Sequence, residues 1–236
     1  MVYRLRTVLS LGLVLVSLVL GALACNTATP TPPTATAPAP TPNPTKAADI
    51  AALISEAKTA LQTGNVNLAI DKLQQALRLD ANSDQAHYLL GNAYAQQGQL
   101  PQAEEQFLQV LKTNDKDADA HSNLGVVYYR QGKLPEAEKA FRTALTLQSD
   151  DADIHYNLGG VLAAENKLDD AIVEFTKAKD LDSSLAEPYL GLGSVYKLQG
   201  KSAEAIAALQ EYLKRSQDPT WRAQAEQMLK ELGAQP

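Results

Sequence analysis

Residues 121–132 read HSNLGVVYYRQG, and both glycines of this stretch belong to a repeat that runs through most of the 236-residue chain. The equivalents of Gly132 recur at one constant interval and are Gly64, Gly98, Asn166 and Gly200. Those of Gly125 are Ala57, Gly91, Gly159 and Gly193. Alanine recurs at 69, 103, 137, 171 and 205, and phenylalanine recurs at 107, 141 and 175. Self-similarity at one period indicates a repeat architecture, and five units fill residues 50–219 without an insertion or a deletion.

Each kind of position has a physical reason in two helices joined by a short turn. The Gly132 position lies between two helical patterns, where a residue with positive φ ends the first helix. Glycine adopts that conformation without strain, and asparagine is its commonest substitute. The Gly125 and Ala137 positions are small, which predicts that the two helices cross closely there. The Phe141 position supplies the apolar bulk around the crossing.

This pattern resembles the tetratricopeptide repeat (TPR), a helix-turn-helix unit of about 34 residues. The stretch at 121–132 is similar to the first helix of that family. The resemblance implies an all-α fold, an α-solenoid of five repeats. We expect the repeats at 50–83, 84–117, 118–151, 152–185 and 186–219.

A capping helix is predicted over residues 220–236. Asp218 and Pro219 are residue types that begin helices, and Gly233 is the type that ends them. The apolar residues between them, at 221, 225, 228, 229 and 232, share one face of a helix. We expect this face to cover the exposed end of the fifth repeat.

The N-terminal segment 1–25 is typical of a lipoprotein-type signal peptide. A short basic segment precedes an apolar run over 8–24, and small residues come before the boundary, as in a secretory leader. The stretch at 22–25, ALAC, resembles the lipobox of bacterial lipoproteins, which implies that Cys25 is lipidated and becomes the mature N-terminus. The alternative is an uncleaved anchor helix, although the run is short for a bilayer, which takes about 20 residues. Either interpretation places the rest of the chain on the extracytoplasmic side, anchored to a membrane.

Residues 26–46 are predicted to be a disordered linker. Up to Thr45 they are only Thr, Pro, Ala and Asn, which offer too little apolar surface to offset the entropy of ordering. The prolines favour an extended conformation, so we expect this linker to hold the folded part away from the membrane.

Charge and motifs exclude several classes of function. The chain has 21 Lys and Arg against 27 Asp and Glu, a net charge of −6, and no basic stripe, which argues against a nucleic-acid partner. No nucleophile elbow, metalloprotease motif or phosphate-binding loop is present, so we predict that the protein is not an enzyme and needs no cofactor.

Three histidines, His87, His121 and His155, recur at the repeat interval and raise the question of a metal site. Equivalent positions of stacked helices lie about 8–10 Å apart, whereas zinc needs ring nitrogens about 2 Å from one point. No pattern of carboxylates accompanies the histidines. We therefore expect them to pack in the core and to bind no metal.

The resemblance to TPR proteins also implies a site. The first helices of such arrays line a concave surface, and variable positions on them contact peptides. The expected peptide-binding residues are Tyr88, Asn92, Asn123, Tyr129, Arg130, Tyr156 and Asn157.

In co-chaperone members of the family, two asparagines and three cations grip a peptide's carboxylate. Asn92 and Asn123 match the asparagines, whereas Tyr88, Asp153 and Asn157 stand where the cations would be. We therefore expect the two amides, each able to offer a donor and an acceptor, to hold a peptide backbone. Removing both is expected to weaken binding and leave the helices intact. The alternative is that asparagines such as Asn123 and Asn157 are structural and serve local bonds.

Together these features predict a non-catalytic, membrane-tethered scaffold that binds a protein or an extended peptide segment on its concave face. The resemblance to lipoproteins that carry this repeat implies that the protein helps to assemble envelope or surface complexes. Two alternatives stay open: an accessory or regulatory subunit of an exported enzyme, and a self-associating array.

Overall fold

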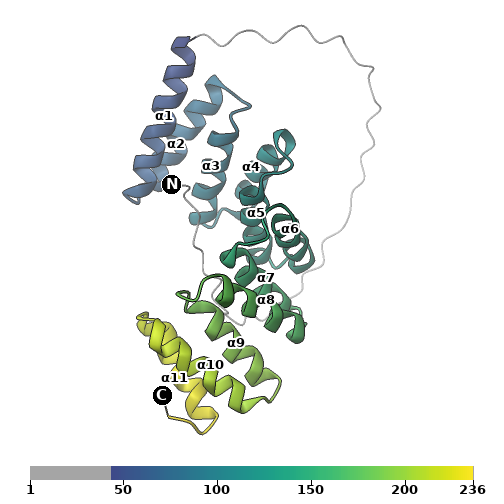
Figure 1. Cartoon of the computed structure of the whole chain (residues 1–236). Coiled ribbons are helices and arrows are strands. Elements are labelled where there is room, and N and C mark those ends of the chain that lie inside the picture. The colour runs from purple at the N-terminus through teal and green to yellow at the C-terminus, as the bar shows by residue number, and fades with distance from the viewer. Residues whose placement is uncertain (1–43, 236) are drawn as a thin grey trace, which may run out of the picture.

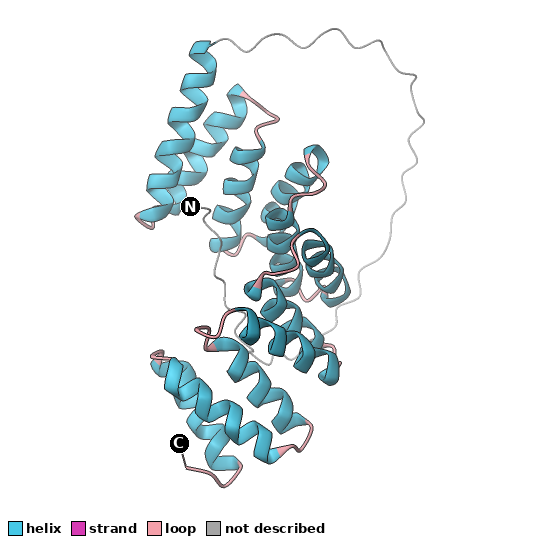
Figure 2. Cartoon of the chain, viewed as in Figure 1, coloured by secondary structure: helices cyan, strands magenta, loops and turns pink. Residues whose placement is uncertain are grey.

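The computed structural model describes residues 44–235, and these form eleven helices and no strand (Figure 2). The signal peptide expected at 1–25, the lipid attachment at Cys25 and the linker positions 26–43 lie outside the described residues. The helices are α1 (Pro44–Gln62), α2 (Val66–Leu79), α3 (Asp84–Gln96), α4 (Leu100–Thr113), α5 (Ala118–Arg130), α6 (Leu134–Leu147), α7 (Ala152–Ala164), α8 (Leu168–Leu181), α9 (Glu187–Leu198), α10 (Ser202–Arg215) and α11 (Pro219–Glu231).

The predicted end of the linker is wrong. Helix α1 begins at Pro44, so positions 44–46, assigned to the linker, are helical. Proline is well tolerated at the first position of a helix, because the N–H that it lacks has no partner there in any case. Lys46 and the alanines that follow it are good helix formers, so the helix extends back to the last proline.

The helices pack as five pairs that follow one another in an arc, which confirms the all-α solenoid (Figure 1). Each first helix (α1, α3, α5, α7, α9) packs on the second helix of its own repeat. From α3 onward, each also packs on the second helix of the repeat before it. Helix α11 packs on α10, as expected of a cap. None of the helices within residues 44–235 combines the length and the apolar character needed to cross a bilayer.

The close crossing predicted within each repeat is present. Phe141 is fully buried, and a Cβ placed on Gly125 would lie 2.9 Å from its ring. Phe175 and Gly159 repeat the arrangement, with a separation of 2.7 Å. A methyl group on either glycine would be too close to the buried ring unless the ring or the helix shifted, so the small and the large position depend on each other.

The turn positions also have the predicted conformation. Asn166 has φ 61°, and the glycines at 64, 98, 132 and 200 have φ between 74° and 77°. Asparagine is one of the few residues other than glycine that adopts this left-handed conformation readily. The missing glycine of the fourth repeat is therefore replaced without a change in the turn.

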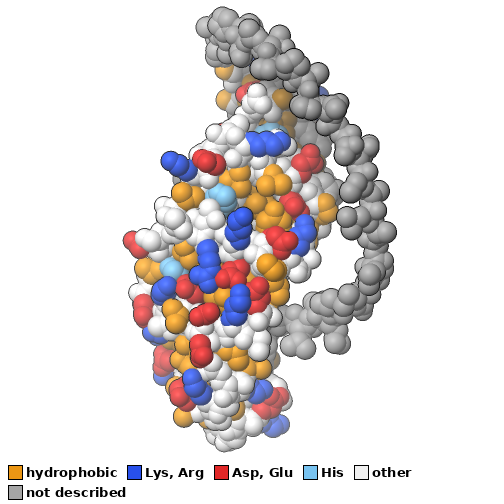
Figure 3. Space-filling view, turned by 90° about the vertical axis from the view of Figure 1, so that its right-hand side faces the viewer, with side chains coloured by type: hydrophobic (Ala, Val, Ile, Leu, Met, Phe, Trp, Pro, Cys, Tyr) orange, Lys and Arg blue, Asp and Glu red, His pale blue; other side chains and the backbone are white. Residues whose placement is uncertain are grey.

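Glu138 of α6 forms one ion pair with the following repeat and one within its own helix. Lys167 Nζ lies 2.6 Å from Glu138 Oε2, and Arg142 Nε lies 2.7 Å from Glu138 Oε1. Acidic and basic side chains accordingly alternate on the face that Figure 3 shows. The hydrogen bond from Lys167, with that from Arg142, lowers the pKa of Glu138 from its ordinary 4.5 to about 2.

We expect Lys167→Met to raise the pKa of Glu138, because it removes the largest cause of the shift. As the pH falls, the carboxyl of Glu138 is protonated in the unfolded chain before it is protonated in the folded one, because its folded pKa is lower. The stability that ionised Glu138 gives the folded protein is therefore complete above the unfolded pKa and is lost as the pH falls through the folded pKa. Carboxyl ¹³C NMR titration measures the pKa directly. Lys139→Met, an exposed change on α6, is the control, and an equal shift in both variants would contradict the assignment.

Candidate functional site

The first helices form the inner surface of the arc. Each contacts the first helix of the next repeat, whereas no two second helices within residues 44–235 are in comparable contact. Helices that lie closer together across repeats are on the inside of a curve, and Figure 1 shows this curvature. We call this surface, formed by α3, α5, α7 and α9, the inner groove.

Three of the predicted residues form one hydrogen-bonded cluster between α3 and α5. Asn123 Nδ2 donates to Tyr88 Oη at 3.0 Å and to Asn92 Oδ1 at 3.1 Å. Asn92 and Asn123 are only 6% and 9% exposed. Burial raises the pKa of the Tyr88 hydroxyl, and the nearby negative charge of Asp119 adds to the rise.

This cluster corrects one part of the predicted amide grip. Both amide hydrogens of Asn123 are used within the protein, so they are not available to a peptide unless these bonds break. Because the bonds join two repeats, removing Asn92 and Asn123 would also cost stability and would not leave the packing unchanged. Peptide binding by these two residues stays a prediction.

Tyr129 and Arg130 lie at the C-terminal end of α5. Arg130 is exposed, and its Nη1 donates to the carbonyl oxygen of Ala95 in α3 at 2.6 Å. Tyr129 is partly buried, and burial raises the pKa of its hydroxyl. Arg130 thus links two first helices while it keeps part of its guanidinium at the surface.

Tyr156 and Asn157 occupy the same places on α7 that Ser122 and Asn123 occupy on α5. The Tyr156 ring packs on Phe175 with 5.7 Å between centroids, and burial raises the pKa of its hydroxyl strongly. Asn157 is 8% exposed, and its Oδ1 has no hydrogen-bond partner among the described residues. This buried acceptor lines a narrow crevice between α5 and α7.

Sequence reasoning missed the acidic character of this surface. Asp119, Asp153 and Glu187 recur at the repeat interval in the first turns of α5, α7 and α9. Asp119 and Asp153 line the crevice beside Asn157. We call these three residues the acidic column. The signal that identifies this column in the sequence is the repeat register that its three members share.

Family comparison agrees with this architecture. Profiles described as tetratricopeptide repeat match residues 90–152, 122–186 and 186–219, and one described as TPR repeat matches residues 58–98. The chain belongs to the tetratricopeptide repeat family. A comparison with curated protein sequences gives no match.

Several solved structures have the same TPR fold. One, from a functional characterization of Pseudomonas aeruginosa PilF, is 21% identical, with a TM-score of 0.70 over 80% of this chain and 86% of that one. MamA is 22% identical, with a TM-score of 0.64 over 72% and 92% of the two chains. YrrB, described as a TPR protein with an unusual peptide-binding site, is 22% identical, with a TM-score of 0.61 over 74% and 90% of the two chains. At these identities the likeness shows the fold alone.

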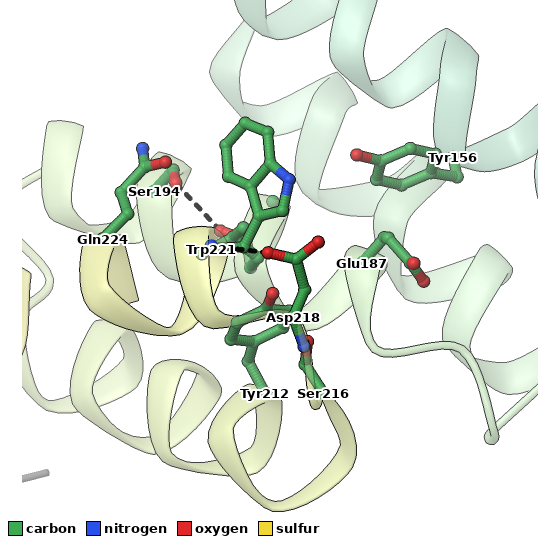
Figure 4. Close-up of a pocket in the computed structure, with 10 residues that line it drawn as sticks. Tyr156, Glu187, Ser194, Tyr212, Ser216, Asp218, Trp221 and Gln224 are labelled. Carbon is green, nitrogen blue, oxygen red and sulfur yellow. Dashed lines mark hydrogen bonds between the residues drawn. The ribbon is translucent and has the colours of Figure 1, made fainter. Parts of the chain in front are cut away.

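A pocket of about 180 Å³ lies where the last TPR unit meets the capping helix (Figure 4). Its walls include Tyr156 from α7, Glu187 and Ser194 from α9, Tyr212 from α10, and Asp218 and Trp221 from the start of α11. We call it the C-terminal pocket. The sequence placed Trp221 on the apolar face of the capping helix, but the indole is only partly buried and borders this opening.

The histidines of the TPR units lie at separate places along one face (Figure 3). His155 is buried, whereas His87 and His121 are partly exposed. Within residues 44–235 no group of three or more His, Cys, Asp or Glu is arranged to hold a metal ion.

His155 packs in the core as expected, whereas His87 and His121 do so only in part, and one carboxylate lies beside His155. Its Nδ1 lies 2.5 Å from Glu174 Oε2 and its Nε2 lies 3.1 Å from the carbonyl oxygen of Ser149. Burial opposes ionisation of Glu174, but hydrogen bonds from His155 and Lys177 outweigh it and lower the pKa of that carboxyl. The second and third repeats have Gln106 and Ala140 at the position of Glu174. The sequence therefore contains no repeating acidic pattern that would predict the pair of His155 and Glu174.

Proposed function

We propose that this TPR array is a non-catalytic scaffold that binds a basic, extended segment of a partner protein along its inner groove. The observation that carries the proposal is the acidic column, which places Asp119, Asp153 and Glu187 on successive first helices. The unpartnered Oδ1 of Asn157 beside the column adds an acceptor for a hydrogen-bond donor of the partner. A surface rich in acceptors and negative charge favours a partner rich in donors and positive charge.

The spacing of the column favours a particular backbone. Packed helices lie about 8–10 Å apart. A polyproline II segment has three residues per turn and rises about 3.1 Å per residue, so residues on one side recur every ~9 Å. Basic side chains at every third residue of such a segment would each face one acidic side chain of the column. The peptide-binding site named for YrrB, which has the same fold, is consistent with a partner of this kind.

The proposal includes attachment to a membrane on the extracytoplasmic side through a lipidated Cys25, with the Thr/Pro-rich residues after it as a spacer. A scaffold held in this way would gather its partner at the surface of the envelope. By resemblance to lipoproteins with TPR units, we propose that the assembled structures are envelope or surface complexes.

The test is binding of a fluorescein-labelled peptide of Lys-Pro-Pro units, measured by fluorescence anisotropy. We expect the triple variant Asp119→Asn, Asp153→Asn, Glu187→Gln to bind it roughly tenfold more weakly. Three partly exposed ion pairs contribute about 0.2–1 kcal/mol each, and 1.4 kcal/mol is a factor of ten. Wild-type affinity should also fall more steeply with salt than that of the variant.

A matched control neutralises three carboxylates on second helices instead, with Glu105→Gln, Asp170→Asn and Glu204→Gln. It changes the net charge equally but leaves the inner groove intact, so it should bind like the wild type. Equal weakening in both variants would mean that only the overall charge attracts the peptide. Sedimentation of the same samples shows whether the chain associates with itself, the result expected of the alternative array.

A further inference from the structure

The C-terminal pocket combines aromatic walls with carboxylates, a pairing that the acidic column lacks. Tyr156, Tyr212 and Trp221 supply the aromatic surface, and Glu187 and Asp218 supply two negative charges. In the view of Figure 4, the Asp218 carboxylate lies between the indole of Trp221 and the ring of Tyr156. The volume of about 180 Å³ is enough for a small planar or ammonium group, since cavities of about 150 Å³ accept benzene.

The walls of the pocket are held in place by the fold. Asp218 Oδ1 accepts hydrogen bonds from the backbone N–H groups of Thr220 at 2.9 Å and Trp221 at 3.1 Å, which fixes the carboxylate at the start of α11. Tyr212 is only 2% exposed, so its ring is a rigid floor. The site therefore exists before a ligand arrives, and little ordering entropy opposes binding.

The chemistry of these groups selects for a cation. Positive groups are attracted to the faces of Trp and Tyr rings, most strongly where water is partly excluded, and carboxylates reinforce that attraction. Glu187 and Tyr156 both line the pocket, and the negative charge of Glu187 adds, after burial, to the raised pKa of the Tyr156 hydroxyl. The guanidinium of Arg222, a cation of the chain near this pocket, is held in place by the hydrogen bonds that it donates to the carbonyl oxygens of Leu213 and Ser216.

We propose that the C-terminal pocket binds a lysine or arginine side chain of the partner segment. This inference rests on the proposed function, because Glu187 belongs both to the acidic column and to the pocket. A segment that runs along the inner groove would place its last basic side chain between Tyr156 and Trp221. The groove attracts by charge, and the pocket adds the shape and the aromatic contact that identify one basic residue.

Trp221 is the single tryptophan of the chain, so its fluorescence reports on this pocket. We would titrate the full chain in detergent with N-acetyl-lysine methylamide, with the arginine analogue, and with N-acetyl-norleucine methylamide as the neutral control. The lysine and arginine compounds should change the emission of Trp221 with saturation, and norleucine should not. Glu187→Gln and Asp218→Asn should each weaken binding roughly twofold to fivefold.

The two variants are chosen so that loss of structure cannot mimic loss of binding. Asparagine caps helices as well as aspartate does, so Asp218→Asn keeps the start of α11, and Glu187→Gln lies on a different helix. Equal responses to norleucine and lysine, or unchanged affinity in both variants, would overturn the inference. Tighter binding of tetramethylammonium than of the capped lysine would overturn it too, because the pocket would then suit a small free cation.

Failure of this inference can be distinguished from failure of the proposed function. Asp119→Asn with Asp153→Asn alters the groove and leaves the pocket residues unchanged. If the Lys-Pro-Pro peptide binds and loses affinity in this double variant while the capped lysine has no effect, the pocket inference fails and the groove stands. If the capped lysine binds and the peptide does not, the C-terminal pocket is a site for a basic side chain, and the proposed binding of a segment along the inner groove fails.

Discussion

Phe175→Ala should lower the free energy of unfolding by about 3–5 kcal/mol, the range typical of removing a buried aromatic ring. The Phe175 side chain is 0% exposed. A Cβ on Gly159 of its own repeat, or on Gly191 of the next, would lie 2.7 Å from the ring. The ring therefore fills the space between two first helices, and neither glycine has a side chain that could close the cavity. Because repeats depend on their neighbours, the loss should weaken α7 to α11 together.

Urea denaturation followed by circular dichroism measures this change. Val173→Ala is the matched control, since Val173 lies on the same helix and is 50% exposed. We expect it to change stability by less than about 1 kcal/mol, because exposed side chains contribute little. A loss below ~1.5 kcal/mol for Phe175→Ala would show that the neighbouring helices collapse into the cavity, contrary to the close crossing described above.

The residues that determine this crossing were predictable because they repeat. A glycine that meets a phenylalanine sixteen positions later in three repeats can be recognised from sequence, and so can Asn166 in place of a turn glycine. Such positions are constrained by the backbone, which every repeat shares. The two helices of each repeat followed from the same constraint, whereas the capping helix followed from its own helix-start residues and apolar face.

Partners of polar side chains could not be predicted in this way, because they depend on what the neighbouring repeat carries. Asn123 bonds to Asn92 and Tyr88 only because the preceding repeat has an amide and a hydroxyl within reach. Asn157 is the equivalent of Asn123 one repeat later, but the repeat before it has Ser122 and Val126 where Tyr88 and Asn92 would be. The Oδ1 of Asn157 therefore has no hydrogen-bond partner among the described residues. Identical residues in one register therefore have different roles, and the candidate site was only partly visible from sequence.

The C-terminal pocket shows a second limit of the same kind. Periodicity assigned Trp221 to the apolar face of the last helix, and that face does pack, with Ala225 and Leu229 fully buried. At the first turn, however, the facing surface is the end of the inner groove, where Tyr156 and Glu187 come from earlier helices. A pattern within one helix cannot show which surface that helix only partly covers.

Cys25→Ser should release nearly all of the protein from membranes, a larger functional effect than any single change in the groove. The proposed anchor is acyl chains on this residue, and each buried CH₂ contributes about 0.8 kcal/mol. One chain gives only marginal attachment, whereas two or more hold a protein durably. Serine has no thiol to acylate, so the whole contribution is lost in one substitution. Fractionation of cells grown with a clickable palmitate analogue measures attachment and lipidation in the same sample.

The neighbouring change Thr27→Ser is the control, because it alters a residue of the spacer and keeps the thiol. It should stay membrane-bound and labelled. A Cys25→Ser protein that carries as much label as the wild type would exclude this attachment site. Membrane retention without label in either protein would instead favour the uncleaved apolar run at 8–24 as the anchor. That run carries no charged side chain, so membrane retention through it should not depend on the thiol of Cys25. An arginine placed at the centre of the run should abolish such retention, because it costs about 2.5–3.5 kcal/mol in a membrane.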